Sequence, residues 1–216
     1  MSSGAGPAPS GDAADAGPPM ADAGPLMLVI SGPSGVGKDS VLSGLKERGV
    51  RAHITVTATT RPRRGDGPDD YLFLSEEAFD QLLAEDGLLE HATVYNYHYG
   101  VPKAPVAEAL GRGEDVLMRV DVQGAATIKK LVPGVVLVFL APPSLEDLED
   151  RLRDRSEDGP EATTRRLDEV GREMARVREF DYVVVNERDR LDQAVDEVLA
   201  IMAAERCRVG RERVVI

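Results

Sequence analysis

The sequence predicts an α/β fold in which a largely parallel β-sheet is flanked by helices. Three observations carry this prediction. From Leu26 onward, short apolar runs alternate with amphipathic stretches of helical period, a pattern typical of parallel sheets covered by helices. A glycine-rich segment joins the first apolar run to the first helical stretch. Residues 58–102 and 151–166 interrupt the alternation, which predicts two additions to the sheet, a β-rich insertion and a helical lid.

Five apolar runs have the length and the β-branched content of buried strands. In chain order they are LMLVI (26–30), HITVT (53–57), DVLMRV (115–120), VVLVFL (135–140) and YVVVN (182–186). Helices are expected after Lys38, Gln123 and Ser144, and a last one is expected over residues 190–205.

The domain organisation follows from shifts in composition. Residues 1–25 are almost entirely Gly, Ala, Pro, Ser and Asp, and ordering them would cost entropy without burying apolar surface, so we expect a disordered extension. One domain is expected over residues 26–208, followed by a C-terminal tail at 209–216. Within the domain, turn signals and tyrosines place the insertion at about 57–102, and arginines around a Gly-Pro break place the lid at about 148–168.

The charge balance excludes several classes of partner. The chain of 216 residues has 26 Lys and Arg against 38 Asp and Glu, for a net charge of −12. Nucleic acids and anionic membranes select basic surfaces, so neither is expected as a partner. Cys207 is the single cysteine, and no apolar run approaches the roughly 20 residues of a membrane span or forms a signal peptide. We expect a cytoplasmic protein with small-molecule partners; the sequence does not give its oligomeric state.

The glycine-rich segment GPSGVGK matches the G-x-x-x-x-G-K phosphate-loop pattern, with a predicted strand before it and a helix after it. Glycines let backbone N–H groups converge on phosphate oxygens, and the helix N-terminus adds partial positive charge. The lysine reaches the β- and γ-phosphates. This predicts a P-loop NTPase sheet that binds ATP through Gly32, Pro33, Ser34, Gly35, Val36, Gly37, Lys38, Asp39 and Ser40.

Asp39 departs from this pattern, which has Ser or Thr at that position to hold Mg²⁺ through its hydroxyl. Ser40 follows directly and is our predicted metal ligand, while a water held by Asp39 is an alternative, because Mg²⁺ keeps several waters and accepts carboxylate contacts. A further alternative is that Asp39 is only a favourable acid in the first turn of a helix.

Arginines cluster in TTRPRRGDG, directly after the second predicted strand, although the protein as a whole is acidic. The arginine side chain offers a planar fork that binds two phosphate oxygens at once, so this cluster is a candidate acceptor-phosphate site. Tyr71, Glu90 and Tyr99 follow as polar groups able to complete a small-molecule pocket. A solvated charged loop is the alternative.

From about Leu26 to Glu205 the chain resembles the guanylate kinase family. The motifs that carry the resemblance are SGPSGVGK, TATTRPRRG, the tyrosine of DDYLF, LLEHA, YHYG, VDVQGA, FLAPPSLEDLEDRL and VVVNE. The resemblance implies that the insertion binds GMP, whose phosphate is held by Arg61, Arg64, Tyr71 and Tyr99. The loop between Arg61 and Tyr71 looks shorter than usual, so Arg63 is an alternative to Arg64.

Recognition of guanine requires a carboxylate for its N1–H and N2 amino donors and a hydroxyl for its O6 acceptor. By resemblance, Glu90 supplies the carboxylate, Thr57 the hydroxyl, and Asp121 lies beside the nucleoside; from the residues alone, Asp121 is equally a helix cap. Two residues depart from the family pattern. Val101 replaces a Ser or Thr, and Arg119 stands where an acidic residue is common.

The predicted lid matches the family's lid as well. Arg151, Arg155 and Arg166 fall on arginines that close over the triphosphate, and Asn186 falls on a position near the adenine. With Lys38 and Arg61, these three arginines are the predicted catalytic residues.

The implied reaction is transfer of the γ-phosphoryl group of ATP to GMP or dGMP, with Mg²⁺ as cofactor, in purine nucleotide metabolism. Two alternatives stay open. GKDS, TRP and YGV also look like the ribose 1,5-bisphosphate phosphokinases, whose acceptor has no base for Glu90 and Thr57 to bind. Guanylate-kinase-like binding modules share the fold without catalysis, but they typically lack an intact phosphate loop.

Overall fold

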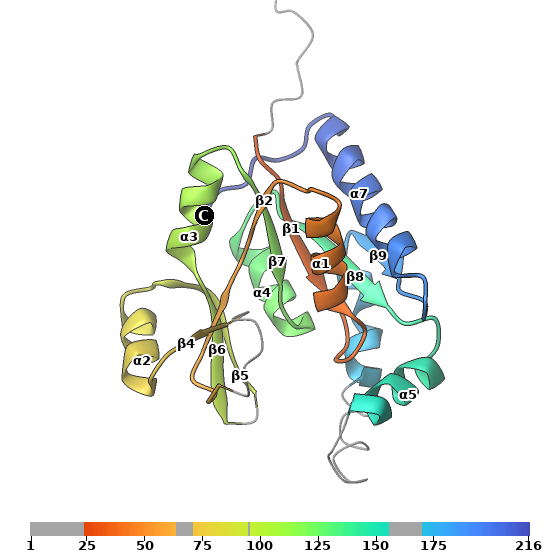
Figure 1. Cartoon of the computed structure of the whole chain (residues 1–216). Coiled ribbons are helices and arrows are strands. Elements are labelled where there is room, and N and C mark those ends of the chain that lie inside the picture. Colours follow the sequence, from red (N-terminus) through yellow and green to blue (C-terminus); the bar gives the residue numbers. More distant parts are fainter. Residues whose placement is uncertain (1–23, 64–70, 95, 156–169) are drawn as a thin grey trace, which may run out of the picture.

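A five-stranded parallel sheet forms the centre of the protein in the computed structural model, which describes residues 24–63, 71–94, 96–155 and 170–216 (Figure 1). Its strands are β1 (Met27–Ser31), β2 (Ala52–Ile54), β7 (Asp115–Arg119), β8 (Val136–Ala141) and β9 (Tyr182–Val185). They lie in the order β2-β7-β1-β8-β9, and each neighbouring pair is parallel. All carboxyl ends therefore meet at one edge of the sheet, the lower edge in Figure 1.

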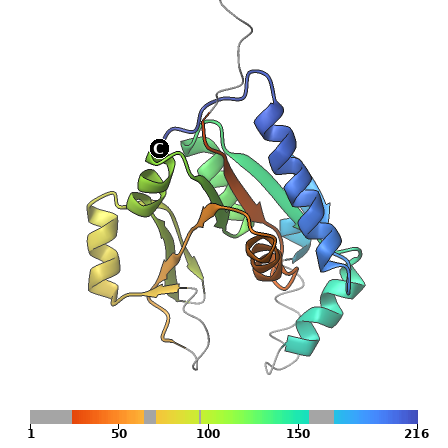
Figure 2. The same cartoon turned by 45° about the horizontal axis from the view of Figure 1, so that its top comes forward.

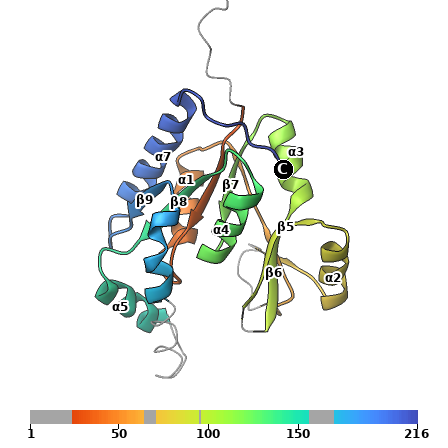
Figure 3. The same cartoon turned by 180° about the vertical axis from the view of Figure 1, so that it is seen from behind.

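Helices cover both faces of this sheet (Figures 1 and 3). The helices α1 (Lys38–Glu47), α5 (Leu145–Arg155) and α7 (Leu191–Cys207) contribute to the core on one face, and α3 (Lys103–Gly111) and α4 (Val122–Leu131) to the core on the other. Side chains of a strand alternate between faces. In β1, Leu28 and Ile30 join the first core, while Met27 and Val29 join the second, so the strand is apolar throughout.

A second, four-stranded sheet stands beside the first. Its strands are β3 (Thr57–Thr59), β4 (Tyr71–Phe73), β5 (Leu88–Val94) and β6 (Tyr97–Pro102), in the order β4-β3-β6-β5. The helix α2 (Glu76–Ala84) covers it by burying Phe79 against Ala58 and Leu88. Figure 2 shows α1 between this second sheet and α5, so the start of α1 faces the space between the two additions.

The α/β fold class predicted from the sequence is confirmed, but one predicted strand is wrong. The run at 53–57 is not a single strand, because β2 ends at Ile54 and the chain crosses to the second sheet at Thr57. Thr55 N–H still donates to Leu117 O at 3.0 Å, whereas Val56 is 45% exposed between the sheets. Among the described helices, α2 within the insertion and α3 directly after it were not predicted, and neither was the short 3-10 helix η1 (Val177–Glu179).

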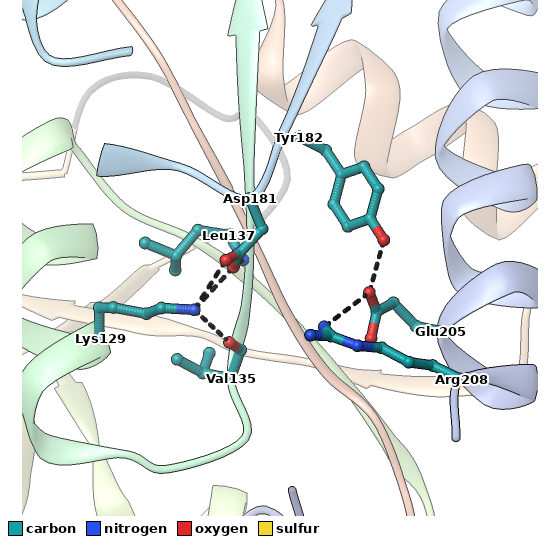
Figure 4. A network of polar contacts seen from close by, with 7 residues as sticks. All are labelled: Lys129, Val135, Leu137, Asp181, Tyr182, Glu205 and Arg208. Carbon is teal, nitrogen blue, oxygen red and sulfur yellow. Dashed lines mark hydrogen bonds and ion pairs between the residues drawn. The ribbon is translucent and has the colours of Figure 1, made fainter. Parts of the chain in front are cut away.

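Polar contacts fasten the β9 side of the central sheet (Figure 4). Lys129 Nζ donates to both carboxylate oxygens of Asp181 at 3.0 and 2.8 Å, and Asp181 also accepts from Leu137 N–H at 2.8 Å. On the other face, Tyr182 donates to the buried carboxylate of Glu205 at 2.5 Å. The partners of Asp181 and of Glu205 Oε1 offset part of the cost of withdrawing these carboxylates from water.

Part of the segment 209–216, predicted as a tail, packs on the domain. Val214 is 8% exposed and belongs to the core shared by α3 and α4. Arg211 donates to the backbone oxygens of Gly24 and Pro25, so the C-terminal segment contacts the start of the described chain. Of the helices described, none has the length and apolar character needed to cross a membrane.

Candidate active site

The phosphate loop lies between β1 and α1, at the carboxyl edge of the central sheet (Figure 1). Two of its glycines are required by the backbone. Gly32 has φ +141°, and a Cβ there would lie 2.2 Å from Leu140 O; Gly37 has φ +101°, and a Cβ would lie 2.4 Å from Asn186 Nδ2. Any larger residue would push the loop off β8 or off Asn186. The loop is therefore held close to the sheet with its backbone turned toward the start of α1.

Lys38 is the first residue of α1, and its side chain folds back over the loop. Its Nζ donates to Gly32 O at 2.6 Å and to Pro33 O at 3.0 Å. Burial lowers the pKa of Lys38 to about 8; Glu173 and Asp121 act to raise it, and the charge of Arg119 lowers it. An ammonium group held in this way by carbonyl oxygens is ready to accept an anionic partner.

Asn186 and Arg151 fasten the loop from the side of β9 and α5. Asn186 is 5% exposed and donates from Nδ2 to Val36 O at 2.8 Å. Arg151 donates to Asn186 O at 2.8 Å and to Val36 O at 3.4 Å, and it pairs with Asp147 at 2.6 Å. Arg151, predicted as a lid arginine, thus contacts the phosphate loop itself.

A cavity of about 440 Å³ opens next to these residues, within the size range of small-molecule sites. Its lining comes from the phosphate loop, from α1, from α5 and from the segment after β9: Gly35, Gly37, Ser40, Arg151, Asn186, Glu187, Arg188, Asp189 and Leu191. The last four were missed by sequence reasoning. Their position directly after a parallel strand is the signal that would have found them, because ligands bind outside the carboxyl ends of such strands.

On the second sheet, Arg61, Tyr71 and Tyr99 form a cluster. The Arg61 guanidinium lies 5.4 Å from the centre of the Tyr71 ring, and the Tyr71 and Tyr99 rings pack edge to face with centres 6.3 Å apart. Arg61 Nε is buried without a hydrogen-bond partner among the described residues. A cation and two phenols brought together in this way form a site suited to a phosphate group.

Thr57 and Glu90 lie at the same level of this sheet. The strand register places Thr57 beside Tyr71 and Glu90 beside Val101. Thr57 and Glu90 are 9% and 7% exposed, and Val101 is fully buried. Burial raises the pKa of Glu90 to about 7, and the charge of Asp121 adds to the shift. The sheet therefore offers one buried carboxyl group and one hydroxyl close to the phosphate cluster.

Asp121 caps α4, as one reading of the sequence predicted. Its Oδ1 accepts from Gly124 N–H at 2.7 Å. A Cβ on Gly124 would lie only 2.9 Å from Glu90 Oε2, so the first turn of α4 is packed against the Glu90 carboxyl group. The cap and the glycine together determine where this carboxyl group lies.

Several predicted site residues lie outside the described part of the chain. Arg64 and Arg166 fall in the segments that are not described, and Arg155 ends α5 without a described side chain. Arg63, the alternative to Arg64, is exposed. Of the residues that the structure does describe, Lys38, Ser40, Arg151 and Asn186 lie around the phosphate loop, whereas Thr57, Arg61, Tyr71, Glu90 and Tyr99 belong to the second sheet.

Comparison with known proteins gives one consistent result. A family model described as guanylate kinase matches residues 25–205. The guanylate kinase of Thermus thermophilus is 46% identical over 187 residues, covering 86% of this chain and 84% of the relative. The guanylate kinase of Gloeobacter violaceus is 47% identical over 181 residues, covering 83% and 87%. The crystal structure of guanylate kinase from Anaplasma phagocytophilum matches with a TM-score of 0.69 and 28% identity, covering 87% and 89%.

Proposed function

The chain belongs to the guanylate kinase family, and from this premise we infer that it is an enzyme that transfers the γ-phosphoryl group of ATP to GMP, giving ADP and GDP. The observation that supports this best is the buried Glu90 carboxyl group beside the phosphate cluster of Arg61, Tyr71 and Tyr99. A sugar phosphate without a base would leave this carboxyl group without a partner, at a cost in binding free energy.

For the donor, we propose that ATP lies in the cavity beside the phosphate loop. The loop residues 32–40 would hold its phosphates through backbone N–H groups and Lys38, while Asn186 and the segment after it would border the adenine. Arg151, which already contacts the loop, would add positive charge near the triphosphate. Arg155 and Arg166 keep their predicted role as lid arginines.

For the acceptor, we propose that Arg61, Tyr71 and Tyr99 bind the GMP phosphate, together with Arg64 or Arg63. The buried Arg61 Nε, which has no hydrogen-bond partner among the described residues, supports this role. Glu90 would accept from the guanine N1–H and N2 amino groups, and Thr57 would donate to O6. Asp121 would lie beside the nucleoside while it caps α4.

The residues present also fit a magnesium ion. Ser40 borders the donor cavity, and its hydroxyl oxygen is a ligand type that Mg²⁺ accepts alongside phosphate oxygens. We propose that Ser40 would hold the ion. When bound, Mg²⁺ supplies positive charge that offsets the charge of the triphosphate.

The chain's own residues then perform the reaction mainly by alignment. The attacking GMP phosphate oxygen is already an anion, so the reaction needs no general base. Arg61 and its two tyrosines hold this oxygen toward the phosphate loop, and Lys38 stabilises the negative charge that spreads over the transferred group. The insertion and the lid would exclude water, which would otherwise take the phosphoryl group.

We further propose a cytoplasmic location. Cys207 is exposed and unpaired, as is usual in a reducing compartment.

The direct test of this function is to identify the products. The full-length protein is incubated with MgATP and GMP, and nucleotides are separated by chromatography; equal amounts of ADP and GDP are expected. Lys38→Met is the control and should lose at least 99% of the activity, because it removes the ammonium group that lies over the phosphate loop and would stabilise the charge of the transferred group. An absence of GDP with intact, folded protein would reject the function and favour a binding module.

A further inference from the structure

Two residues that depart from the family pattern contact each other. Asp39, where a hydroxyl residue is expected, lies in the first turn of α1, and Arg119, where an acidic residue is common, ends β7. The Arg119 guanidinium forms an ion pair with the Asp39 carboxylate. The two departures are therefore one feature of the site, a charge pair between the phosphate-loop helix and the central sheet.

The two partners differ in burial. The Arg119 side chain is 16% exposed, whereas that of Asp39 is 68% exposed. A guanidinium that is largely withdrawn from water is costly unless an anion and hydrogen-bond acceptors compensate it. Arg119 thus depends on Asp39 far more than Asp39 depends on Arg119. This gives Asp39 a role that requires no contact with a metal ion.

Arg119 also reaches the second sheet. Its guanidinium carbon lies 5.3 Å from the centre of the Tyr71 ring, almost the same distance as that of Arg61. A planar guanidinium over an aromatic face is attracted to the ring and restricts its orientation. Tyr71 lies on β4, a strand of only three residues at the edge of the sheet, so its phenol depends on such contacts for its position.

We propose that Asp39 and Arg119 form a positioning unit that aligns the two substrates. Asp39 holds Arg119, and Arg119 holds the Tyr71 phenol in the orientation that receives the GMP phosphate. Through this unit, the start of the phosphate-loop helix is connected to the acceptor sheet. The inference rests on the proposed function, in which Tyr71 binds the acceptor phosphate.

The test combines steady-state kinetics with direct measurement of GMP binding by calorimetry. Arg119→Met should raise KM and Kd for GMP about tenfold, the effect expected from loss of a desolvated cation–aromatic contact, with KM for ATP changed less than threefold. Asp39→Asn should act in the same direction, and the double variant should match Arg119→Met, since the pair acts as one unit. Arg119→Lys keeps the charge without the planar contact and should recover only part of the loss.

Two comparisons separate positioning from a general structural role. In a Tyr71→Phe background, Arg119→Met should cost less than a further threefold in GMP binding, because the phenol it positions is already absent. Arg206→Met is the matched control: it removes the arginine partner of Asp115, at the opposite end of β7, and should leave the constants for both substrates unchanged.

The inference would be overturned by an unchanged Kd for GMP in Arg119→Met, by a loss confined to ATP, by additive effects of Asp39→Asn and Arg119→Met, or by an undiminished effect in the Tyr71→Phe background. Failure of the proposed function is distinct, because the wild-type protein would then form no GDP at all. If Arg119→Met does not fold, Arg119→Lys and Asp39→Asn supply the same comparison.

Discussion

At the scale of single residues, Glu90 is the side chain to which we assign recognition of the base. It is the one acidic side chain on the second sheet whose burial is nearly complete among the described residues, and it lies beside Val101 in the strand register. Val101 is fully buried and has an apolar side chain, whereas the family pattern has a Ser or Thr hydroxyl at this position. Under the proposed function, recognition of guanine would depend more heavily on Glu90 and Thr57 here than in a site that also has that hydroxyl.

Replacing Glu90 with Gln should raise KM for GMP about 100-fold, because two hydrogen bonds to a carboxylate become one bond and one unfavourable amide contact. KM for ATP should change less than threefold. Initial rates at varied GMP and ATP provide both constants. Equal losses for the two nucleotides would mean that Glu90 acts only through the fold.

Below pH 7, the pH dependence of kcat/KM for GMP should follow the ionisation of the Glu90 carboxyl group. Burial raises its pKa from 4.5 to about 7, so the free enzyme gains the carboxylate that guanine needs only as the pH rises through 7. The value of kcat/KM for GMP should therefore fall up to tenfold per pH unit below 7. In Glu90→Gln this fall should disappear, leaving the smaller change near pH 6 that comes from the phosphate of GMP itself.

Ionisation of Glu90 should have the opposite effect on stability: activity rises with pH, whereas the free energy of unfolding falls. Between about pH 4.5 and 7 the folded protein keeps a proton on Glu90 that the unfolded chain has lost, so the free energy of unfolding should fall as the pH rises through this range, by about 3 kcal/mol in total. Urea denaturation of the wild type and of Glu90→Gln at pH 5 and pH 8 measures the difference. A stability gap between the two proteins that does not change with pH would contradict the assigned pKa.

At the scale of elements, the first turn of α4 supports the base site. The Gly124→Ala variant places a Cβ 2.9 Å from Glu90 Oε2 and should raise KM for GMP about tenfold by displacing the carboxyl group. Gly111→Ala, in α3, is the matched control, because nothing lies within 4 Å of a Cβ there. It should leave KM unchanged and change the free energy of unfolding by less than about 0.5 kcal/mol, because Gly111 is the last residue of α3.

The sequence predicts elements well where one physical signal dominates. The apolar runs at β1, β7 and β8 are buried on both faces of a parallel sheet, so their composition alone identifies them. The run at β9 is equally apolar, although β9 is an edge strand in which Val183 and Val185 are 51% and 40% exposed. The run at 53–57 fails because Thr55 and Val56 have strand propensity but serve as a crossing between two sheets. Propensity describes single residues, whereas the sheet to which a residue belongs is decided by distant partners.

In the candidate site, too, the sequence predicts what local residues determine and misses what distant residues determine. Motif spacing identifies the phosphate loop, because the backbone geometry within the loop itself requires glycine at these positions. Asp39 and Arg119 are 80 positions apart in the sequence, and no local sequence pattern predicts that they form an ion pair. The hydrogen bond from Arg151 to Val36 O is equally non-local, because it forms only when α5 packs on the phosphate loop.

At the scale of the whole molecule, the two ends of the described chain are joined. Val214 is buried in the core, and Arg211 bonds to the backbone just before β1. Val214→Ala should lower the free energy of unfolding by about 1–2 kcal/mol, the cost of removing a buried branched side chain. Val209→Ala, at a position that is 86% exposed, should change it by less than 0.5 kcal/mol. Equal effects in thermal or urea unfolding would contradict the packing of the C-terminal segment.

The arrangement of the whole molecule also explains why one fold can serve this reaction. The cavity that we propose for the donor lies on the α5 side of the phosphate loop, and the cluster that we propose for the acceptor lies on the second sheet across α1 (Figures 1 and 2). Two phosphates can thus approach Lys38 from opposite sides. In the proposed function, the identity of the acceptor is decided mainly by the second sheet, since the phosphate loop serves any kinase on this scaffold.

Acceptor selectivity shows most directly whether the second sheet binds a guanine nucleotide. The full-length protein is assayed by coupled ADP release with GMP, dGMP, AMP, CMP and ribose 1,5-bisphosphate, each at concentrations that give kcat/KM. We predict GMP as the best acceptor, followed by dGMP, with the sugar bisphosphate at least 1,000-fold poorer because it leaves the buried Glu90 without a partner. Turnover with ribose 1,5-bisphosphate that equals or exceeds turnover with GMP would contradict the account.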